Sequence, residues 1–254
     1  MTGSAGDVDY EVHGHGYASR RRTDPRIAAL VHAALGDART VLNVGAGAGS
    51  YEPGDRYVVA VEPSAAMRAQ RPPHLAPAVI ATAEHLPFDG GAFEAAMAMV
   101  TVHQWSDPEA GLRELRRVTR GSVVVLTFDR DALDRWWLAD YAPELLVAER
   151  ARYPAVDEIA ALLGGEADVR VVPVPLDCVD GFTEAFYGRP EALLDPAVRA
   201  AQSAWGFVDP AAAERAVGRL RDDLGSGSWD RRYGEWRTRP EFEGSLRLVV
   251  SPPA

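Results

Sequence analysis

The chain has 254 residues, 47% of them hydrophobic, which is enough for one α/β domain with an appendage or for two small domains. Its formal net charge of -10 argues against a nucleic-acid scaffold, because phosphate binding needs a basic face. All 27 basic residues are arginine, which excludes a Schiff-base lysine and a lysine-anchored phosphate loop, and the single cysteine excludes a disulfide framework within one chain.

Residues 1–23 are predicted to form a flexible, glycine-rich arm without the apolar core of a signal peptide. No apolar run reaches the ~20 residues of a membrane span, so we expect a cytoplasmic protein with no membrane partner. The first helix is expected to begin at Asp24-Pro25, because Asp24 can cap free N–H groups and Pro25 fits the first helical position.

Residues 24–174 alternate short apolar runs with helical stretches, which favours a doubly wound α/β core. Continuous apolar runs are typical of parallel strands that are buried on both faces. The predicted strands of the core are 41–44, 58–61, 78–81, 95–100, 122–128 and 169–174. The predicted helices that follow the first are 65–70, 108–118, 133–152 and 157–163.

Residues 175–240 read as consecutive helical segments, at about 183–187, 196–205 and 210–224. A last strand at about 245–250 lies in the segment 241–254, the final strand and tail. We therefore predict a Rossmann-like, mostly parallel seven-stranded sheet, with a helical insertion, or lid, before the last strand.

The first predicted strand runs straight into a glycine-rich turn, Gly45-Ala46-Gly47-Ala48-Gly49. Such a turn lets the backbone approach a ligand where a Cβ would collide. The second strand ends at Glu62, whose carboxylate can accept hydrogen bonds from the ribose hydroxyls of an adenosine ligand. A dinucleotide fingerprint would have its third glycine one residue later, where Ser50 stands, and would lead into a long helix. The ligand is therefore expected to be an adenosine without phosphate.

Further blocks complete a recognisable set: 62–64 (Glu-Pro-Ser), 83–88 (Ala-Glu-His-Leu-Pro-Phe), 102–105 (Val-His-Gln-Trp) and 112–118. With the glycine turn, they resemble the class I S-adenosylmethionine-dependent methyltransferases, in particular the small-molecule, type 11-like group. The resemblance covers about residues 17–130. It implies that S-adenosylmethionine is the cofactor and S-adenosylhomocysteine the product.

The resemblance also implies which residues contact this cofactor. The glycine turn passes its methionine part, Glu62 holds the ribose, and Val100 lies beside the sulfonium. The implied cofactor-binding residues are Tyr17, Arg22, Asn43, Gly45, Ala46, Gly47, Glu62, Pro63, Met67, Thr82, Ala83, Glu84 and Val100. Met67 is alternatively a core residue of its helix, and either Arg21 or Arg22 could pair with the methionine carboxylate. Relatives usually have an acidic residue at Asn43 and often Asp at Thr82, and both departures weaken the expected polar contacts.

His103 is the candidate general base, with a structural loop histidine packed on Trp105 as the alternative. No carboxylate–histidine cluster points to a metal. The partner is expected to be a hydrophobic or aromatic small molecule, methylated at O, N or C, in natural-product biosynthesis, and the protein a monomer or homodimer. Aromatic residues in or near the insertion could line its site: Trp136, Trp137, Tyr141, Phe182, Phe186, Tyr187, Trp205, Trp229, Tyr233 and Trp236. A cofactor-binding protein that does not methylate and, with less support from the glycine spacing, a nicotinamide-dependent oxidoreductase are the alternatives.

Overall fold

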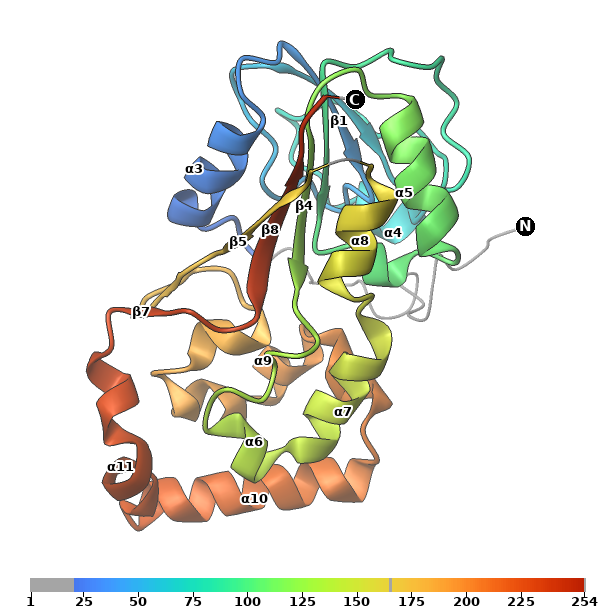
Figure 1. Ribbon diagram of the computed structural model, residues 1–254. Coiled ribbons are helices and arrows are strands. Elements are labelled where there is room, and N and C mark those ends of the chain that lie inside the picture. Colours follow the sequence, from blue (N-terminus) through green and yellow to red (C-terminus); the bar gives the residue numbers. More distant parts are fainter. Residues whose placement is uncertain (1–20, 165, 254) are drawn as a thin grey trace.

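A computed structural model of the protein describes residues 21–164 and 166–253; the predicted arm, apart from its last three residues, lies outside them. A six-stranded sheet with the order β2-β1-β3-β4-β8-β5 forms the centre (Figure 1). Neighbouring strands from β2 to β4 are parallel, whereas β8 is antiparallel to both β4 and β5. The strands are β1 (Thr40–Val44), β2 (Tyr57–Val61), β3 (Ala95–Met99), β4 (Val123–Phe128), β5 (Asp168–Val171) and β8 (Leu246–Ser251).

Helices cover both faces of this sheet, which confirms the doubly wound α/β prediction. Helix α3 (Pro25–Ala34) begins where expected, with the Asp24 carboxylate accepting from the Arg26 N–H at 3.0 Å. It packs on one face, while α5 (Pro108–Arg117) and α8 (Val156–Leu162) pack on the other (Figure 1). The short helix α4 (Ala65–Arg68) follows β2. Each face therefore has its own layer of buried side chains.

The prediction of a strand at 78–81, which would have made the sheet seven-stranded, is wrong. Among the described residues this segment forms only a single bridge, between Val79 and Val61. Val79 donates its N–H to the Ala60 carbonyl and accepts from Glu62 N. The parallel ladder would next need an N–H from residue 77, but Pro77 has none. The pairing therefore stops after one residue.

The run 169–174 is also different from the prediction. It was expected to be a buried parallel strand, but β5 is antiparallel, lies at the sheet edge and has exposed side chains. Pro173 interrupts the run, and the chain continues as β6 (Val174–Pro175), which pairs with β7 (Glu241–Phe242) in a separate two-stranded sheet.

The predicted helix 133–152 is broken into α6 (Leu138–Tyr141) and α7 (Pro143–Arg152), because Pro143 cannot continue a helix that precedes it. The insertion is helical, as expected, but much of it is 3₁₀-helix. Its elements are η2 (Thr183–Phe186), η3 (Pro190–Leu194), α9 (Pro196–Ala200), η4 (Ser203–Phe207), α10 (Pro210–Gly225), α11 (Ser228–Tyr233) and η5 (Gly234–Thr238).

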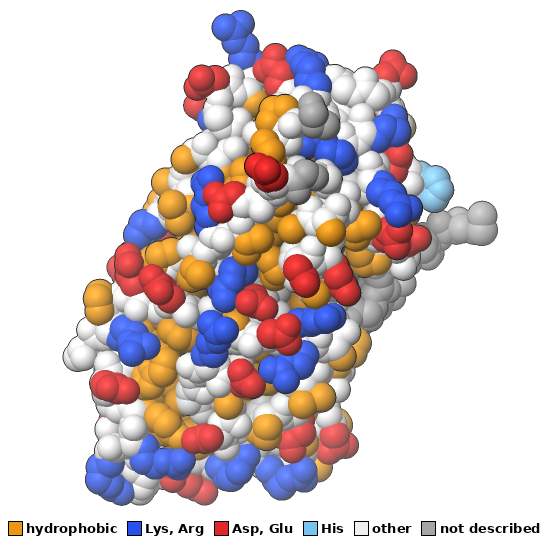
Figure 2. Space-filling view, viewed as in Figure 1, with side chains coloured by type: hydrophobic (Ala, Val, Ile, Leu, Met, Phe, Trp, Pro, Cys, Tyr) orange, Lys and Arg blue, Asp and Glu red, His pale blue; other side chains and the backbone are white. Residues whose placement is uncertain are grey.

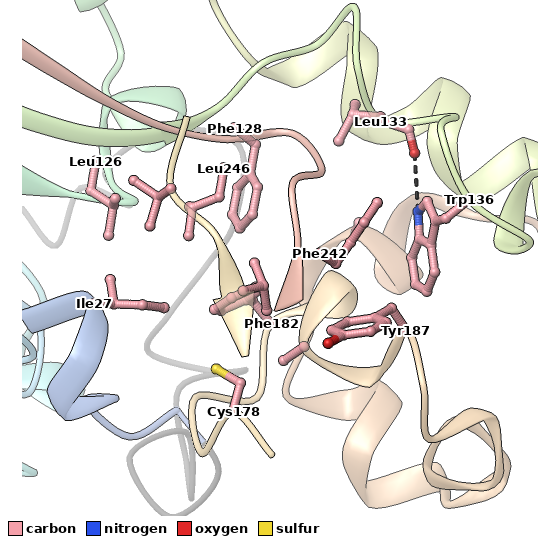
Figure 3. Packing of buried hydrophobic residues seen from close by; sticks show 14 of the residues in the cluster. Ile27, Leu126, Phe128, Leu133, Trp136, Cys178, Phe182, Tyr187, Phe242 and Leu246 are labelled. Atoms are coloured by element: carbon pink, nitrogen blue, oxygen red, sulfur yellow. Dashed lines mark hydrogen bonds between the residues drawn. The ribbon is translucent and has the colours of Figure 1, made fainter. Parts of the chain in front are cut away.

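One hydrophobic cluster runs from α3 and the sheet into the insertion (Figure 3). In it, Trp136 donates its indole N–H to the Leu133 carbonyl at 3.1 Å, and Phe242 packs between Trp136 and Tyr187. The predicted domain boundaries at residues 174 and 240 stay a prediction. On the surface, Figure 2 shows acidic and basic side chains intermixed over the face that Figure 1 presents. No helix among the described residues has the length and apolar character needed to traverse a membrane.

Candidate active site

The glycine loop follows β1 directly and has little space for side chains. Gly45 and Gly47 have φ angles of +66° and +52°, in the left-handed region that favours glycine. A Cβ at Gly45 would overlap the side chain of Thr101, which follows β3. At Gly47 a Cβ would lie 3.2 Å from the terminal methyl of Met67. The loop therefore presents bare backbone between two neighbouring strand ends.

Glu62 is buried and holds this loop to the start of α4. Its Oε2 accepts from the Gly47 N–H at 2.8 Å and its Oε1 accepts from the Ser64 N–H at 2.9 Å. Burial raises the pKa of Glu62, while these hydrogen bonds and the nearby arginines Arg68 and Arg71 oppose the rise. Each carboxylate oxygen has a second lone pair, so the pair of ribose hydroxyls predicted from the sequence could still be accepted. Pro63, the next residue, is half-buried.

Asn43 belongs to a buried hydrogen-bond network that was not predicted from the sequence. Its Nδ2 donates to Glu52 at 3.0 Å, and Glu52 forms a bidentate ion pair with Arg71, with both bonds at 3.0 Å. Both side chains of this ion pair are at most 4% exposed. A carboxylate only accepts, so the Asn43 amide must face it with nitrogen, which leaves Oδ1 as a buried acceptor without a partner among the described residues. That orphaned oxygen fits a donor such as the amino group of the predicted cofactor.

The block 82–84 lies against the start of α5. Glu84 accepts from the Ser106 hydroxyl at 2.9 Å and from the Asp107 N–H at 3.1 Å, and Ala83 is buried. Thr82 is half-buried and also bonds to the Glu84 carboxylate, which helps to keep the pKa of that group low despite partial burial. Glu84 is thus held at the helix start, and its predicted contact with adenine stays a prediction.

Of Arg21 and Arg22, the two arginines considered for the methionine carboxylate, Arg21 makes a contact inside the protein. Its Nε donates to Asp180 Oδ1 at 2.6 Å, and the Tyr51 hydroxyl donates to Asp180 Oδ2 at 2.7 Å. Asp180 belongs to the insertion and is 2% exposed. Burial, then the Asp180 carboxylate, holds the pKa of Tyr51 well above its usual value. Arg22 is exposed, and Tyr17 lies outside the described residues.

Beyond β3 the chain borders a small, partly open cavity, here called the insertion cavity, with about 30 Å³ of room for water-sized molecules. Val100 lines it with a φ of +51°, a strained conformation for a β-branched residue. His103 lines it from η1 (Val102–Gln104), and Phe128 from the end of β4. The other lining residues come from the arm, from α7 and the residue after it, and from the insertion: Arg21, Glu149, Tyr153, Phe182, Thr183, Glu184, Gln202 and Ser203.

His103 is buried, and its pKa is well below the usual value because burial and the charges of Arg152 and Arg21 oppose protonation. Its ring packs against that of Tyr153, with centroids 4.4 Å apart. Its Nε2 lies 2.6 Å from Gln104 Nε2, and with the amide nitrogen as donor the ring accepts there. The neutral imidazole therefore already uses one lone pair for a protein contact.

Sequence reasoning missed two glutamates of the cavity, the buried Glu184 and the half-buried Glu149. Burial raises the pKa of Glu149 and of Glu184 to about 7. Glu184 accepts from the Ser245 N–H with both oxygens, at 2.9 and 3.0 Å. Glu149 lies within the predicted helix 133–152, four residues after the buried Leu145 and so on the same helix face. The four-residue spacing from Leu145 could have indicated that the Glu149 side chain faces the protein interior.

Most aromatic residues proposed for the substrate site pack on one another instead. Trp137 donates to the Tyr187 carbonyl at 2.7 Å and its ring lies 5.4 Å from that of Trp229. Of the aromatic set named from the sequence, Phe182 lines the insertion cavity. These residues therefore stabilise the insertion, and the cavity has a more polar lining than the sequence indicated.

Comparison with known proteins agrees with this geometry. Residues 42–127 match the family model of a methyltransferase domain. A solved structure assigned as a methyltransferase of an antibiotic biosynthesis pathway in Anabaena variabilis ATCC 29413 has a TM-score of 0.85 and 29% identity, over 92% of this chain and 99% of that one. A search of the curated proteins found no match.

Two more distant structures share the fold. Geranyl diphosphate C-methyltransferase from Streptomyces coelicolor A3(2) has 15% identity and a TM-score of 0.50, over 91% of this chain and 80% of that one. The [4+2]-cyclase SpnF has the same identity and score, over 90% and 80%. The matched domain and the shared fold identify residues 42–127 as a class I, type 11-like methyltransferase domain, whose cofactor is S-adenosylmethionine.

Proposed function

We propose that this protein transfers a methyl group from S-adenosylmethionine to an O, N or C atom of a small-molecule acceptor. One observation carries the proposal: the glycine loop and the insertion cavity share a wall. Thr101 lies against Gly45, while its neighbour Val100 and, one turn on, His103 line the cavity. A methyl donor at the loop and an acceptor in the cavity would therefore meet at this wall.

The residues of the glycine loop and its surroundings fit the cofactor. Gly45 and Gly47 offer bare backbone, Glu62 has acceptor capacity for the ribose, and the orphaned Asn43 Oδ1 suits the amino group. Met67, whose methyl lies over Gly47, offers an apolar surface to the adenine. The bound cofactor supplies an already activated methyl group, so the chain has to place the acceptor in line and exclude water.

The insertion and its neighbours supply the exclusion of water. The cavity is closed on one side by the ends of β3 and β4 and on the other by α7 and η2. In that setting His103, neutral at pH 7, is one candidate to accept a proton from the acceptor. A role in natural-product biosynthesis is supported by the antibiotic-pathway assignment of the Anabaena protein, which covers nearly the whole chain.

A non-methylating role is the second candidate, because the SpnF cyclase has the same fold and because Asn43 and Thr82 depart from the family pattern. A calorimetric titration with S-adenosylmethionine and S-adenosylhomocysteine tests cofactor binding, and Glu62→Ala should weaken it by about 1–3 kcal/mol through lost charge-assisted hydrogen bonds. Glu94→Ala, a carboxylate at the opposite end of the sheet, is the control and should bind as the wild type does. A mass increase of one methyl group in a screened acceptor supports transfer; tight binding with no such product from any acceptor favours the second candidate.

A further inference from the structure

Three polar groups of the insertion cavity form a connected set. The Thr183 hydroxyl lies 3.4 Å from Glu149 Oε1 and 3.1 Å from Gln202 Oε1, so the carboxylate and the amide are within reach of one small molecule. Gln202 Oε1 also accepts from the Trp205 indole N–H at 3.1 Å, which fixes the amide orientation. A carboxylate and an amide therefore meet at the same hydroxyl group.

Two of these groups have unused hydrogen-bonding capacity. Gln202 is 5% exposed, and its Nε2 has no partner among residues 21–164 and 166–253. The Thr183 hydroxyl, 3.4 Å away, is the single side-chain donor near the Glu149 carboxylate within that part of the chain, and its one proton has the closer Gln202 Oε1 as an alternative acceptor. A buried donor without a partner is unfavourable, so a ligand that accepts from Gln202 Nε2 and donates to the Glu149 carboxylate is favoured. Glu184, by contrast, is fully occupied by Ser245.

The charges around Glu149 decide which kind of ligand fits. Arg152, on the same helix, and Arg21, from the arm, both act on Glu149 and on His103. Their positive charges stabilise a developing negative charge, and Arg152 contributes more than Arg21, which is paired with Asp180. Glu184, across the cavity, adds a carboxyl whose pKa burial raises to about 7. This environment suits a neutral hydroxyl that becomes an oxyanion better than a protonated amine.

We propose, on the basis of the methyltransferase function proposed above, that the acceptor carries a phenolic or enolic hydroxyl beside a carbonyl, that Glu149 accepts the hydroxyl proton, and that Gln202 Nε2 donates to the carbonyl. The acceptor oxygen then forms a bond to the methyl carbon as the carbon–sulfur bond breaks, with its electron pair going to sulfur. The proton stays on Glu149 until solvent removes it. His103 then packs beside the site and does not act as the base.

Burial supports this assignment because a carboxyl with a pKa of about 7 is half-ionised at neutral pH and matched to general-base work. His103 is less suited, since its pKa is well below the usual value and its Nε2 already accepts from Gln104. The rings of Phe128 and Phe182 pack on each other, with centroids 5.4 Å apart, and give the same cavity an apolar, aromatic wall.

The test uses 2-hydroxyacetophenone as the probe and benzylamine as its cationic counterpart, titrated by calorimetry into the full chain loaded with S-adenosylhomocysteine. We expect saturable binding of the phenol and at least tenfold weaker binding of the amine. Gln202→Glu keeps the Oε1 acceptor but replaces the donor, and should weaken binding of the phenol about tenfold. Stronger binding of the amine, or no saturable binding of the phenol, overturns the inference.

The second arm measures transfer from S-adenosylmethionine to the phenol between pH 5.5 and 9. Glu149→Gln should lower kcat by about 10²-fold or more with KM within about threefold, and should remove the rise of the rate with pH. Glu144→Gln makes the same change on an exposed site of α7 and should match the wild type. Equal rates for both variants overturn the role of Glu149. Failure of S-adenosylhomocysteine to bind contradicts the proposed function itself, whereas cofactor binding with methylation of amines or carbon alone contradicts this inference.

Discussion

The glycine-loop region, residues 43–67, and the insertion cavity are built in opposite ways. The first comes from one short stretch of chain and offers mostly backbone, with Glu62 and the Asn43–Glu52–Arg71 network holding it in shape. The second gathers single side chains from β3, β4, α7 and the insertion. The glycine loop needs positions without side chains, so that a ligand can approach the backbone. The insertion cavity instead depends on individual polar and charged side chains. We therefore expect substitutions in the glycine-loop region to lower the stability of the fold, and substitutions in the insertion cavity to act mainly through charge and pH.

The largest expected effect tests what holds the glycine-loop region together. Glu52→Leu leaves Arg71 buried without its partner, which should cost about 3–5 kcal/mol of unfolding free energy. Urea unfolding measures the loss. Asp134→Leu removes the partner of Arg150 in an exposed ion pair and should change stability by about 1 kcal/mol or less. If the two variants lose equal stability, the buried network does not support the loop as described.

The next effect isolates the need for bare backbone. Gly45→Ala should destabilise the fold by about 2–4 kcal/mol, because it combines left-handed strain with overlap on Thr101. Gly36→Ala is a matched control, since Gly36 has a φ of +60° but open space around it, and should cost about 1–2 kcal/mol. Thermal unfolding of both variants gives the difference. Losses of the same size would mean that the turn conformation, and not the close approach of Thr101, restricts residue 45.

The smallest effect concerns the insertion cavity. The pKa of Glu149 is raised in the folded protein, so ionising it costs stability as pH rises from about 4.5 to about 7. Glu149→Gln removes that cost and should be more stable than the wild type by about 1–2 kcal/mol at pH 8, with no gain at pH 4.5. Arg152, Arg21 and Thr183 reduce the effect by stabilising the carboxylate, while Glu184 opposes them. Unfolding curves of the wild type and the variant at both pH values test this prediction. A stability gain of the same size at pH 4.5 and pH 8 would contradict a raised pKa of Glu149.

The same contrast explains what the sequence could predict. The alternation of apolar runs and helical stretches predicted the α/β fold, and the glycine turn, Glu62 and the neighbouring blocks, all within one part of the chain, carried the resemblance that implied the cofactor. Strand 78–81 could not be judged correctly, because its loss depends on where Pro77 falls in the ladder with β2. Glu149 and Gln202 are far apart in sequence, and only the folded chain shows that both reach Thr183. A site formed by the backbone of one short segment can be predicted from a local sequence motif. A site formed by side chains from distant segments can be found only in the folded structure.

The Asp180 carboxylate ties together three segments that would otherwise be free to shift: Arg21 at the base of the arm, Tyr51 just after the glycine turn, and the insertion itself. Rotating the insertion outward to admit a bulky molecule would break the Tyr51 hydrogen bond and the Arg21 ion pair together. The position of the insertion is therefore coupled, through one carboxylate, to the position of the segment that follows the glycine turn.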